Sequence, residues 1–119
     1  MGRKIYLVLF IIAYVISVPV FGSDMLTEIE HILTFVEKTE CQFERNGKMY
    51  TGENAVEHIR KKYHYYKDKI DSTERFIELS ATKSTISGKH YMILCKGNPK
   101  ITSQEWLLLE LEHYRSKIR

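Results

Sequence analysis

The sequence has little of the chemistry that marks a metal or redox site. It contains only two cysteines, Cys41 and Cys95, and their spacing is far from that of a Cys-x-x-Cys pair. It contains five histidines, and none of them form the His-x-x-x-His pair of a helical metal site. Unless distant histidines converge in the fold, these absences exclude a metal centre, and we expect neither a metal nor a cofactor. The histidines are His31, His58, His64, His90 and His113.

The phosphate loop of nucleotide-binding enzymes is also missing. That motif is Gly-x-x-x-x-Gly-Lys-Ser/Thr at the start of a helix, but here Lys83 replaces the first glycine and His90 follows Lys89. Ser80 and Lys83 have the Ser-x-x-Lys spacing of penicillin-recognising serine enzymes. This tetrad is common by chance, and the chain is too short for that fold. The sequence therefore argues against both enzyme classes.

Long apolar runs are absent except for one at the start of the chain. Two basic residues precede an uncharged apolar segment over residues 5–18, and a proline and small residues follow it. This arrangement predicts a secretory signal peptide over residues 1–22. The alternative is an uncleaved membrane anchor, but the run is shorter than the ~20 apolar residues of a spanning helix. We expect an exported protein, periplasmic or secreted, with one domain over residues 23–119 and no membrane span once the signal is removed.

In an exported protein, the two cysteines predict one disulfide bond between Cys41 and Cys95. The bond would close a loop of about 55 residues, which stabilises a protein by about 4 kcal/mol in the chain-entropy model. A reactive thiol is the alternative. A Cys95 nucleophile activated by His90 is not expected, because the two residues face opposite sides of a regular strand.

Apolar residues at helical spacing predict two amphipathic helices in the first half of the chain. The first spans residues 24–38 and is capped by Ser23 or Asp24. The second spans residues 52–70, with Thr51 as its N-cap. The buried stripes are predicted to be Leu26, Ile29, Leu33 and Val36 in the first helix, and Val56, Ile59, Tyr63, Tyr66 and Ile70 in the second.

A β-hairpin is predicted between these helices. Asn46-Gly47 favours a type I′ turn, because both central residues of that turn take positive φ. A two-residue loop sets the register, so that Phe43 lies opposite Tyr50. Cys41 then shares a face of the sheet with both aromatic residues.

The second half of the chain predicts a helix, a loop and a strand. A short third helix begins at Asp71, with Glu74 completing a capping box. Residues 82–89 are rich in Ser, Thr, Lys and Gly, which is typical of a loop; we call this segment the polar loop. Residues 90–96 predict a strand that is apolar on both faces and therefore central in the sheet.

The last helix has the strongest start signal. Thr102 is the expected N-cap, with Glu105 at the third helical position, and Arg115 suits the negative end of the helix dipole. The element order is α-β-β-α-α-β-α. It predicts a small α+β domain in which a three-stranded, mostly antiparallel sheet packs against about four helices. The buried stripe of the last helix is predicted to be Leu107, Leu111, Tyr114 and Ile118.

Several motifs occur in one fixed order along the chain. They are Phe43-x-Arg45-Asn46-Gly47, Ala55-Val56-x-His58-Ile59-Arg60-x-Lys62, Ile70-Asp71-x-x-Glu74-x-Phe76-Ile77 and Ser84-x-Ile86-Ser87-Gly88-Lys89-x-Tyr91. Together they resemble the YfeK-like family of small exported bacterial proteins, a domain of unknown function. The resemblance implies an exported protein of a Gram-negative bacterium and implies no activity.

Polar members of these motifs form the candidate site. The hairpin tip, the second helix and the polar loop can meet at one end of the sheet, and there they would offer many hydrogen-bond donors and few acceptors, the profile of an anion site. A purely structural role, with His58 bonded to the loop backbone, is the competing interpretation. We call the candidate residues the polar cluster: Arg45, Asn46, His58, Lys62, Ser84, Ser87 and Lys89.

Charge is distributed unevenly, although the formal net charge is only +3. Residues 24–44 hold six acids and one lysine, whereas residues 79–104 hold four lysines and no acid. Residues 60–67 interleave bases with aromatic residues, as single-strand nucleic-acid binders do. Because two of these tyrosines belong to the predicted buried stripe, we favour a solvated basic face and expect no nucleic acid.

The sequence therefore favours a non-enzymatic binding module with an anion-favouring site. Its partner is unknown; an anionic envelope component or an acidic protein surface would suit the charge. One alternative is a small hydrolase or transferase with His58 as general base. Another is a secreted inhibitor or an immunity-type protein.

Overall fold

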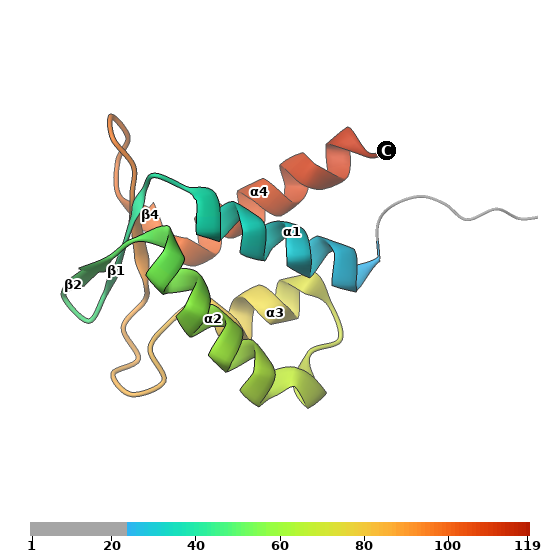
Figure 1. Cartoon of the computed structure of the whole chain (residues 1–119), viewed down its shortest axis with the longest axis horizontal. Coiled ribbons are helices and arrows are strands. Elements are labelled where there is room, and N and C mark those ends of the chain that lie inside the picture. Colours follow the sequence, from blue (N-terminus) through green and yellow to red (C-terminus); the bar gives the residue numbers. More distant parts are fainter. Residues whose placement is uncertain (1–23) are drawn as a thin grey trace, which may run out of the picture.

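The computed structural model describes residues 24–119, so the predicted signal peptide lies outside the described part of the chain. Four helices and a small antiparallel sheet make an α+β domain, with the sheet at one end (Figure 1). No helix within residues 24–119 has the length and apolar character needed to cross a bilayer. The elements are α1 (Met25–Lys38), β1 (Gln42–Arg45), β2 (Lys48–Tyr50), α2 (Gly52–Tyr66), a 3₁₀ turn (Lys67–Lys69), α3 (Thr73–Ser80), β3 (Met92–Leu94), β4 (Ile101–Thr102) and α4 (Ser103–Lys117).

The sheet has four strands in the order β2-β1-β3-β4, so the prediction of three strands was wrong by one. The missing strand is β4, whose two residues pair with β3 immediately before α4 begins. Two residues are too few to show a period-2 pattern. Thr102 also has a second role, because its side chain accepts the N-cap hydrogen bond from the backbone N–H of Glu105. The predicted central position of β3 is confirmed, since it lies between β1 and β4.

The hairpin has the predicted register. Phe43 lies opposite Tyr50, and the turn residues Asn46 and Gly47 have φ values of 52° and 83°. Asparagine and glycine tolerate this left-handed region better than other residues, which explains why this dipeptide closes the turn.

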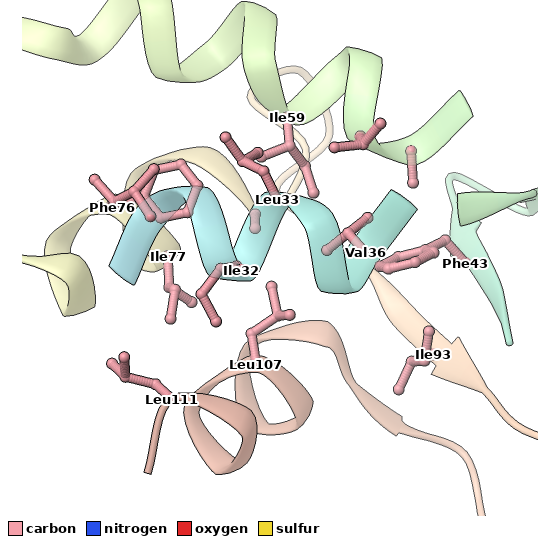
Figure 2. Packing of buried hydrophobic residues seen from close by; sticks show 14 of the residues in the cluster. Ile32, Leu33, Val36, Phe43, Ile59, Phe76, Ile77, Ile93, Leu107 and Leu111 are labelled. Carbon is pink, nitrogen blue, oxygen red and sulfur yellow. The ribbon is translucent and has the colours of Figure 1, made fainter. Parts of the chain in front are cut away.

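Helix α1 forms the centre of the hydrophobic core, between α2 on one side and α4 on the other (Figure 2). The predicted stripe is right except at its first position, because Leu26 is 61% exposed and Ile32 is fully buried instead. Gly52 starts α2 where a side chain would not fit, since a Cβ there would come within 2.2 Å of the carbonyl oxygen of Val36. This close approach sets the packing of α2 on the end of α1.

Two helix ends and one buried stripe differ from the predictions. Helix α2 ends at Tyr66, and the chain continues as a 3₁₀ turn before Ile70. The N-cap of α3 is Ser72, one residue after the predicted Asp71, and its hydroxyl accepts from the backbone N–H of Arg75 at 3.0 Å. In α4 the buried stripe stops at Leu111, and Ile118 is exposed.

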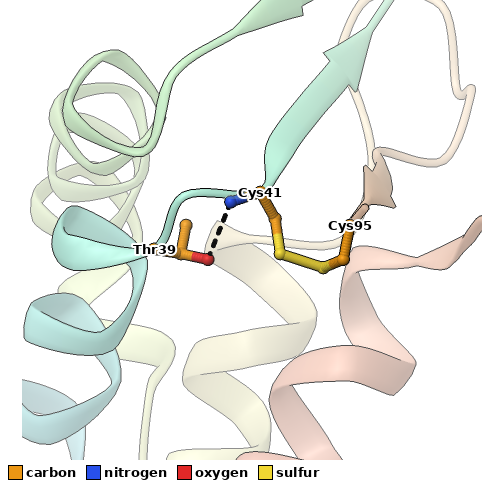
Figure 3. The surroundings of a disulfide bond; sticks show 3 residues. All are labelled: Thr39, Cys41 and Cys95. Atoms are coloured by element: carbon orange, nitrogen blue, oxygen red, sulfur yellow. Dashed lines mark hydrogen bonds between the residues drawn. A yellow bond between two sulfur atoms is a disulfide. The ribbon is translucent and has the colours of Figure 1, made fainter. Parts of the chain in front are cut away.

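The predicted disulfide is present between Cys41 and Cys95 (Figure 3). It links the start of β1 to the end of β3, the two central strands, at the end of the sheet opposite the hairpin tip. The Thr39 hydroxyl accepts a hydrogen bond from the backbone N–H of Cys41 at 3.1 Å. Since both cysteines are in the bond, the reactive-thiol alternative does not apply to this structure.

Candidate functional site

The hairpin tip and the polar loop are joined by side-chain hydrogen bonds. The Asn46 amide nitrogen donates to the Ser84 hydroxyl at 3.3 Å, and the Ser87 hydroxyl donates to the Asn46 amide oxygen at 2.6 Å. Asn46 therefore uses both ends of its amide, from a turn position at which its φ is positive. Segments about 40 residues apart in the chain form one end of the sheet, as predicted, and Figure 1 shows them side by side.

The polar loop is closed by its own hydrogen bonds. Ser84 is buried, and its hydroxyl accepts from the backbone N–H groups of Ile86 and Ser87, each at 3.2 Å. Its backbone N–H donates to the Lys89 carbonyl at 2.9 Å, and its carbonyl accepts from Gly88 at the same distance. Ser84 is thus the centre of a compact turn, with Gly88 supplying the positive φ of 78° that the turn requires.

Beside this loop, Tyr91 joins two members of the polar cluster. Its hydroxyl lies 3.1 Å from Nε2 of His58 and accepts from Nζ of Lys62 at 3.3 Å. Nζ of Lys62 also donates to the Lys83 carbonyl at 2.7 Å, which ties α2 to the start of the loop. His58 and Lys62 lie one turn apart on α2, so both side chains reach the same point on the sheet.

The electrostatic environment of these groups is positive. The pKa of His58 is lowered to about 4, first by burial and then by the positive charges of Arg45, Lys62 and Lys61. The pKa of Lys62 is also lowered, first by burial and then by Arg45 and Lys83. Burial raises the pKa of Tyr91, while Arg45 opposes the rise. The cations around His58, Lys62 and Tyr91 therefore disfavour the protonated forms of these three side chains. A negatively charged ligand would be attracted to the space between them.

A small pocket opens beside His58. Its volume is about 20 Å³, enough for about one water molecule, so a larger ligand would lie across the mouth. Arg45 borders this mouth and lies over the Tyr50 ring, with its guanidinium carbon 4.6 Å from the ring centroid. The pocket is lined by Phe43, Arg45, Tyr50, Asn54, Ala55, His58, Ile59 and Tyr91.

The structure brings most of the predicted cluster together. Arg45, Asn46, His58 and the loop serines lie within one hydrogen-bonded and electrostatic group, as does Lys62. Lys89 is exposed, and its contact with the cluster is made by its backbone N–H, which donates to the Ser87 hydroxyl at 3.1 Å. Sequence reasoning missed the role of Tyr91. The one available signal was its place as the last residue of the family's loop motif.

The other candidate chemistries find little support in the described residues. No group of three or more His, Cys, Asp or Glu side chains within residues 24–119 is placed to hold a metal ion. In the basic stretch 60–67, Tyr63 and Tyr66 pack against the core, whereas Tyr65 is 80% exposed. Stacking platforms for successive bases are therefore not available there.

A second charged group lies at the far end of the helices and was not predicted. Glu28 is buried in α1, where it accepts from Nε and Nη2 of Arg115 at 2.8 and 2.9 Å and from the Thr73 hydroxyl at 2.6 Å. Arg115 also donates to Glu74 at 2.6 Å, and this hydrogen bond is the main reason why the pKa of Glu74 is lowered. We call these four residues the Arg115 network. Arg115 thus pairs with carboxylates of α1 and α3 and does not act only on its own helix dipole.

Comparison with known proteins places the chain among proteins whose function is not established. A family model described as a family of unknown function, DUF5329, matches residues 23–115. The chain is 31% identical over 85 residues to the uncharacterized protein YfeK of Salmonella typhimurium (strain LT2), an alignment covering 68% of this chain and 71% of the relative. No solved structure matches the chain. The YfeK-like resemblance is therefore confirmed, and the chain belongs to the DUF5329 family.

Proposed function

We propose that this chain is an exported, non-enzymatic binding module that takes an anionic group at the polar cluster. The observation that carries the proposal is the gathering of Arg45, Lys62 and Lys83 around His58 and Tyr91, where each charged neighbour that shifts the pKa of His58 is a cation. Mutual repulsion of this kind costs stability unless a negative charge joins the group. An anion at the mouth of the pocket would relieve it.

The donors suit a tetrahedral or planar oxyanion. The Arg45 guanidinium presents several N–H groups in a fixed plane, which favours two-point contact with a phosphate, sulfate or carboxylate. The Lys62 ammonium has three N–H donors, and the Lys83 carbonyl and the Tyr91 hydroxyl account for two of them. The remaining donor can turn to a ligand at the same mouth.

The same electrostatics weaken the enzyme alternative. A general base at neutral pH works best with a pKa near 7, whereas that of His58 is about 4. Accepting a proton would also place an imidazolium next to Arg45 and Lys62, and its Nε2 is already occupied by the Tyr91 hydroxyl. His58 is therefore better suited to orient Tyr91 than to remove protons.

The inhibitor alternative also lacks a supporting surface. An inhibitor of this size would present a continuous apolar patch. The large exposed apolar residues are instead spread over several elements, for example Leu26 on α1, Tyr65 on α2 and the pair Leu108 and Leu109 on α4. We therefore keep the anion-binding module as the single proposal.

The test is a titration with inorganic sulfate at matched ionic strength, with chloride as the reference salt. Protein purified after expression of the full chain should gain thermal stability from sulfate beyond the gain from chloride. Arg45→Gln should weaken this effect about tenfold, because a hydrogen bond to a charged group is worth about 1.5–3 kcal/mol. Lys100→Gln is the matched control, since Lys100 pairs with Glu44 at 3.2 Å and is not a member of the polar cluster.

A second readout separates binding at the cluster from general salt effects. Bound sulfate should raise the pKa of His58, measured from its ring proton shifts, because a nearby negative charge favours the imidazolium. If sulfate leaves that pKa near its starting value and protects the Arg45→Gln variant equally, the cluster does not bind anions.

Export is tested separately. The predicted signal peptide implies that the protein recovered from a periplasmic extract begins close to residue 23. The intact mass of that protein shows whether residues 1–22 have been removed. Recovery of the full chain in the cytoplasmic fraction would overturn this part of the proposal.

A further inference from the structure

The apex of the polar loop carries an isoleucine in an unusual setting. Ile86 is 95% exposed, more than any other large apolar residue among residues 24–119. Single exposed apolar side chains are ordinary, but they usually lie on a surface that shields part of them. Ile86 instead projects from a turn whose hydrogen bonds hold its backbone in place. Its exposure is therefore a feature of an ordered loop.

Four backbone donors at the apex of the polar loop are satisfied within the loop. The N–H groups of Ile86 and Ser87 both donate to the Ser84 hydroxyl, and those of Gly88 and Lys89 donate to the Ser84 carbonyl and the Ser87 hydroxyl. In a medium poor in water, each unsatisfied backbone group would cost several kcal/mol, on the order of 2–7. This apex can therefore enter such a medium with these four N–H groups already paired.

Cations surround the apex. Lys83 and Lys89 flank it within the loop, and both are exposed. Lys48 is also exposed and directly follows the hairpin turn. This turn lies next to the polar loop, because Asn46 accepts a hydrogen bond from Ser87. The segment from residue 79 to 104 that includes the loop contains no acid. An apolar tip ringed by lysines is complementary to a surface that is negatively charged outside and apolar beneath.

We propose that this end of the sheet docks on an anionic phospholipid bilayer, with Ile86 entering the interface and the surrounding lysines contacting the headgroups. The inference rests on the proposed function, because the headgroup phosphate would be the anion at the polar cluster. Only one large apolar residue enters, and Thr85 and Ser87 beside it are polar. The association is therefore shallow and reversible, in contrast to the insertion of a spanning helix.

The experiment is sedimentation of the exported protein with lipid vesicles, after its mass has shown that the N-terminal apolar segment is gone. Vesicles of phosphatidylcholine alone are compared with vesicles that also contain phosphatidylglycerol. We expect binding to the anionic vesicles that falls as salt is added. Ile86→Ser should weaken the affinity for these vesicles about tenfold, because burying an isoleucine side chain contributes at least that factor to the binding constant. Lys89→Gln should weaken binding about fivefold, and on anionic vesicles only.

Leu109→Ser is the matched control, because Leu109 is also exposed, at 60%, but lies on α4. It should bind like the natural protein. Equal binding of the natural protein to both kinds of vesicle, or equal binding by the Ile86→Ser variant, would overturn the inference. The sulfate titration keeps the two proposals apart: if sulfate protects the protein but anionic vesicles do not bind it, the anion site stands and bilayer docking is wrong.

Discussion

The two ends of the domain treat charge in opposite ways. At the helical end, Arg115 lies between the carboxylates of Glu28 and Glu74, and its charge is matched by theirs (Figure 1 shows these helix ends far from the sheet). At the sheet end, Arg45 and Lys62 lower the pKa of His58, and Arg45 and Lys83 lower that of Lys62. At the helical end the positive charge is paired with carboxylates, whereas at the sheet end positive charges repel one another.

This difference separates structural charges from functional ones. A buried carboxylate such as Glu28 is tolerable only when it is paired and hydrogen-bonded, so the Arg115 network is explained by folding alone. Folding alone does not require cations to crowd around a half-buried histidine. Natural proteins keep such local conflicts mainly where a ligand needs them. The comparison therefore supports the sheet end as the site, and four experiments can break or sharpen it.

The largest expected effect comes from the disulfide, which stabilises the domain as a whole and belongs to neither charged group. Replacing Cys41 and Cys95 together by serine should lower the free energy of unfolding by about 4 kcal/mol, because the bond closes a long loop of the unfolded chain. Urea unfolding without reductant measures this loss. The pKa of His58 should stay near 4 in the folded variant. A large change in that pKa would mean that the charge pattern at the sheet end depends on the bond.

The helical end gives the next largest effect. Arg115→Met leaves the Glu28 carboxylate buried without its main partner and should cost about 3 kcal/mol in urea unfolding. Adding Glu28→Gln should recover part of the loss, because a neutral amide can still accept from the Thr73 hydroxyl. Arg119→Met is the control, since Arg119 meets Glu112 at 3.6 Å where both side chains are mostly exposed. Equal losses in the free energy of unfolding for Arg115→Met and Arg119→Met would show that the Arg115 network does not stabilise the fold.

Local rules predicted much of the fold from the sequence. The Asn46-Gly47 turn fixed the hairpin register, and the caps at Thr51 and Thr102 are where the pattern placed them. Each of these features depends on residues only a few positions apart. The pairing of Cys41 with Cys95 spans 54 positions, but two cysteines allow only one bond. Strand β4 was missed because its two residues carry no periodic signal.

The polar contacts between distant segments were predicted less well. Arg115 and Glu28 lie 87 positions apart, and nothing in either helix pattern indicates that they meet. For the candidate site, the family motifs named residues most of which the structure brings together, but they did not show that the Tyr91 hydroxyl would connect His58 with Lys62. Such contacts depend on how the elements pack, which local sequence rules do not determine.

The sheet end gives the third effect, a dependence of stability on pH. Between pH 6.5 and about 4, the unfolded chain protonates His58 while the folded domain keeps it neutral, so stability falls as pH is lowered through this range. Melting temperatures of the natural protein should therefore drop more steeply over this range than those of His58→Gln. In Arg45→Gln the pKa of His58 should rise toward 6.5, because one of the repelling cations is gone. Parallel pH profiles for the natural protein and His58→Gln would show that the histidine is not under strain.

The smallest effect concerns the contact that assembles the sheet end. Asn46→Gly keeps the positive φ of the turn but removes the amide that bonds Ser84 and Ser87. Because these hydrogen bonds are partly exposed, the variant should lose only about 1 kcal/mol in urea unfolding. The hydrogen exchange of the Gly88 and Lys89 amides should nevertheless quicken, since the polar loop is no longer held to the hairpin. If exchange is unchanged, the loop is ordered by Ser84 alone, and its position next to Arg45 is not maintained by Asn46. If exchange quickens and sulfate binding weakens with it, the Asn46 hydrogen bonds and the anion site form one unit. Removing a charge from the Arg115 network should then leave sulfate binding unchanged.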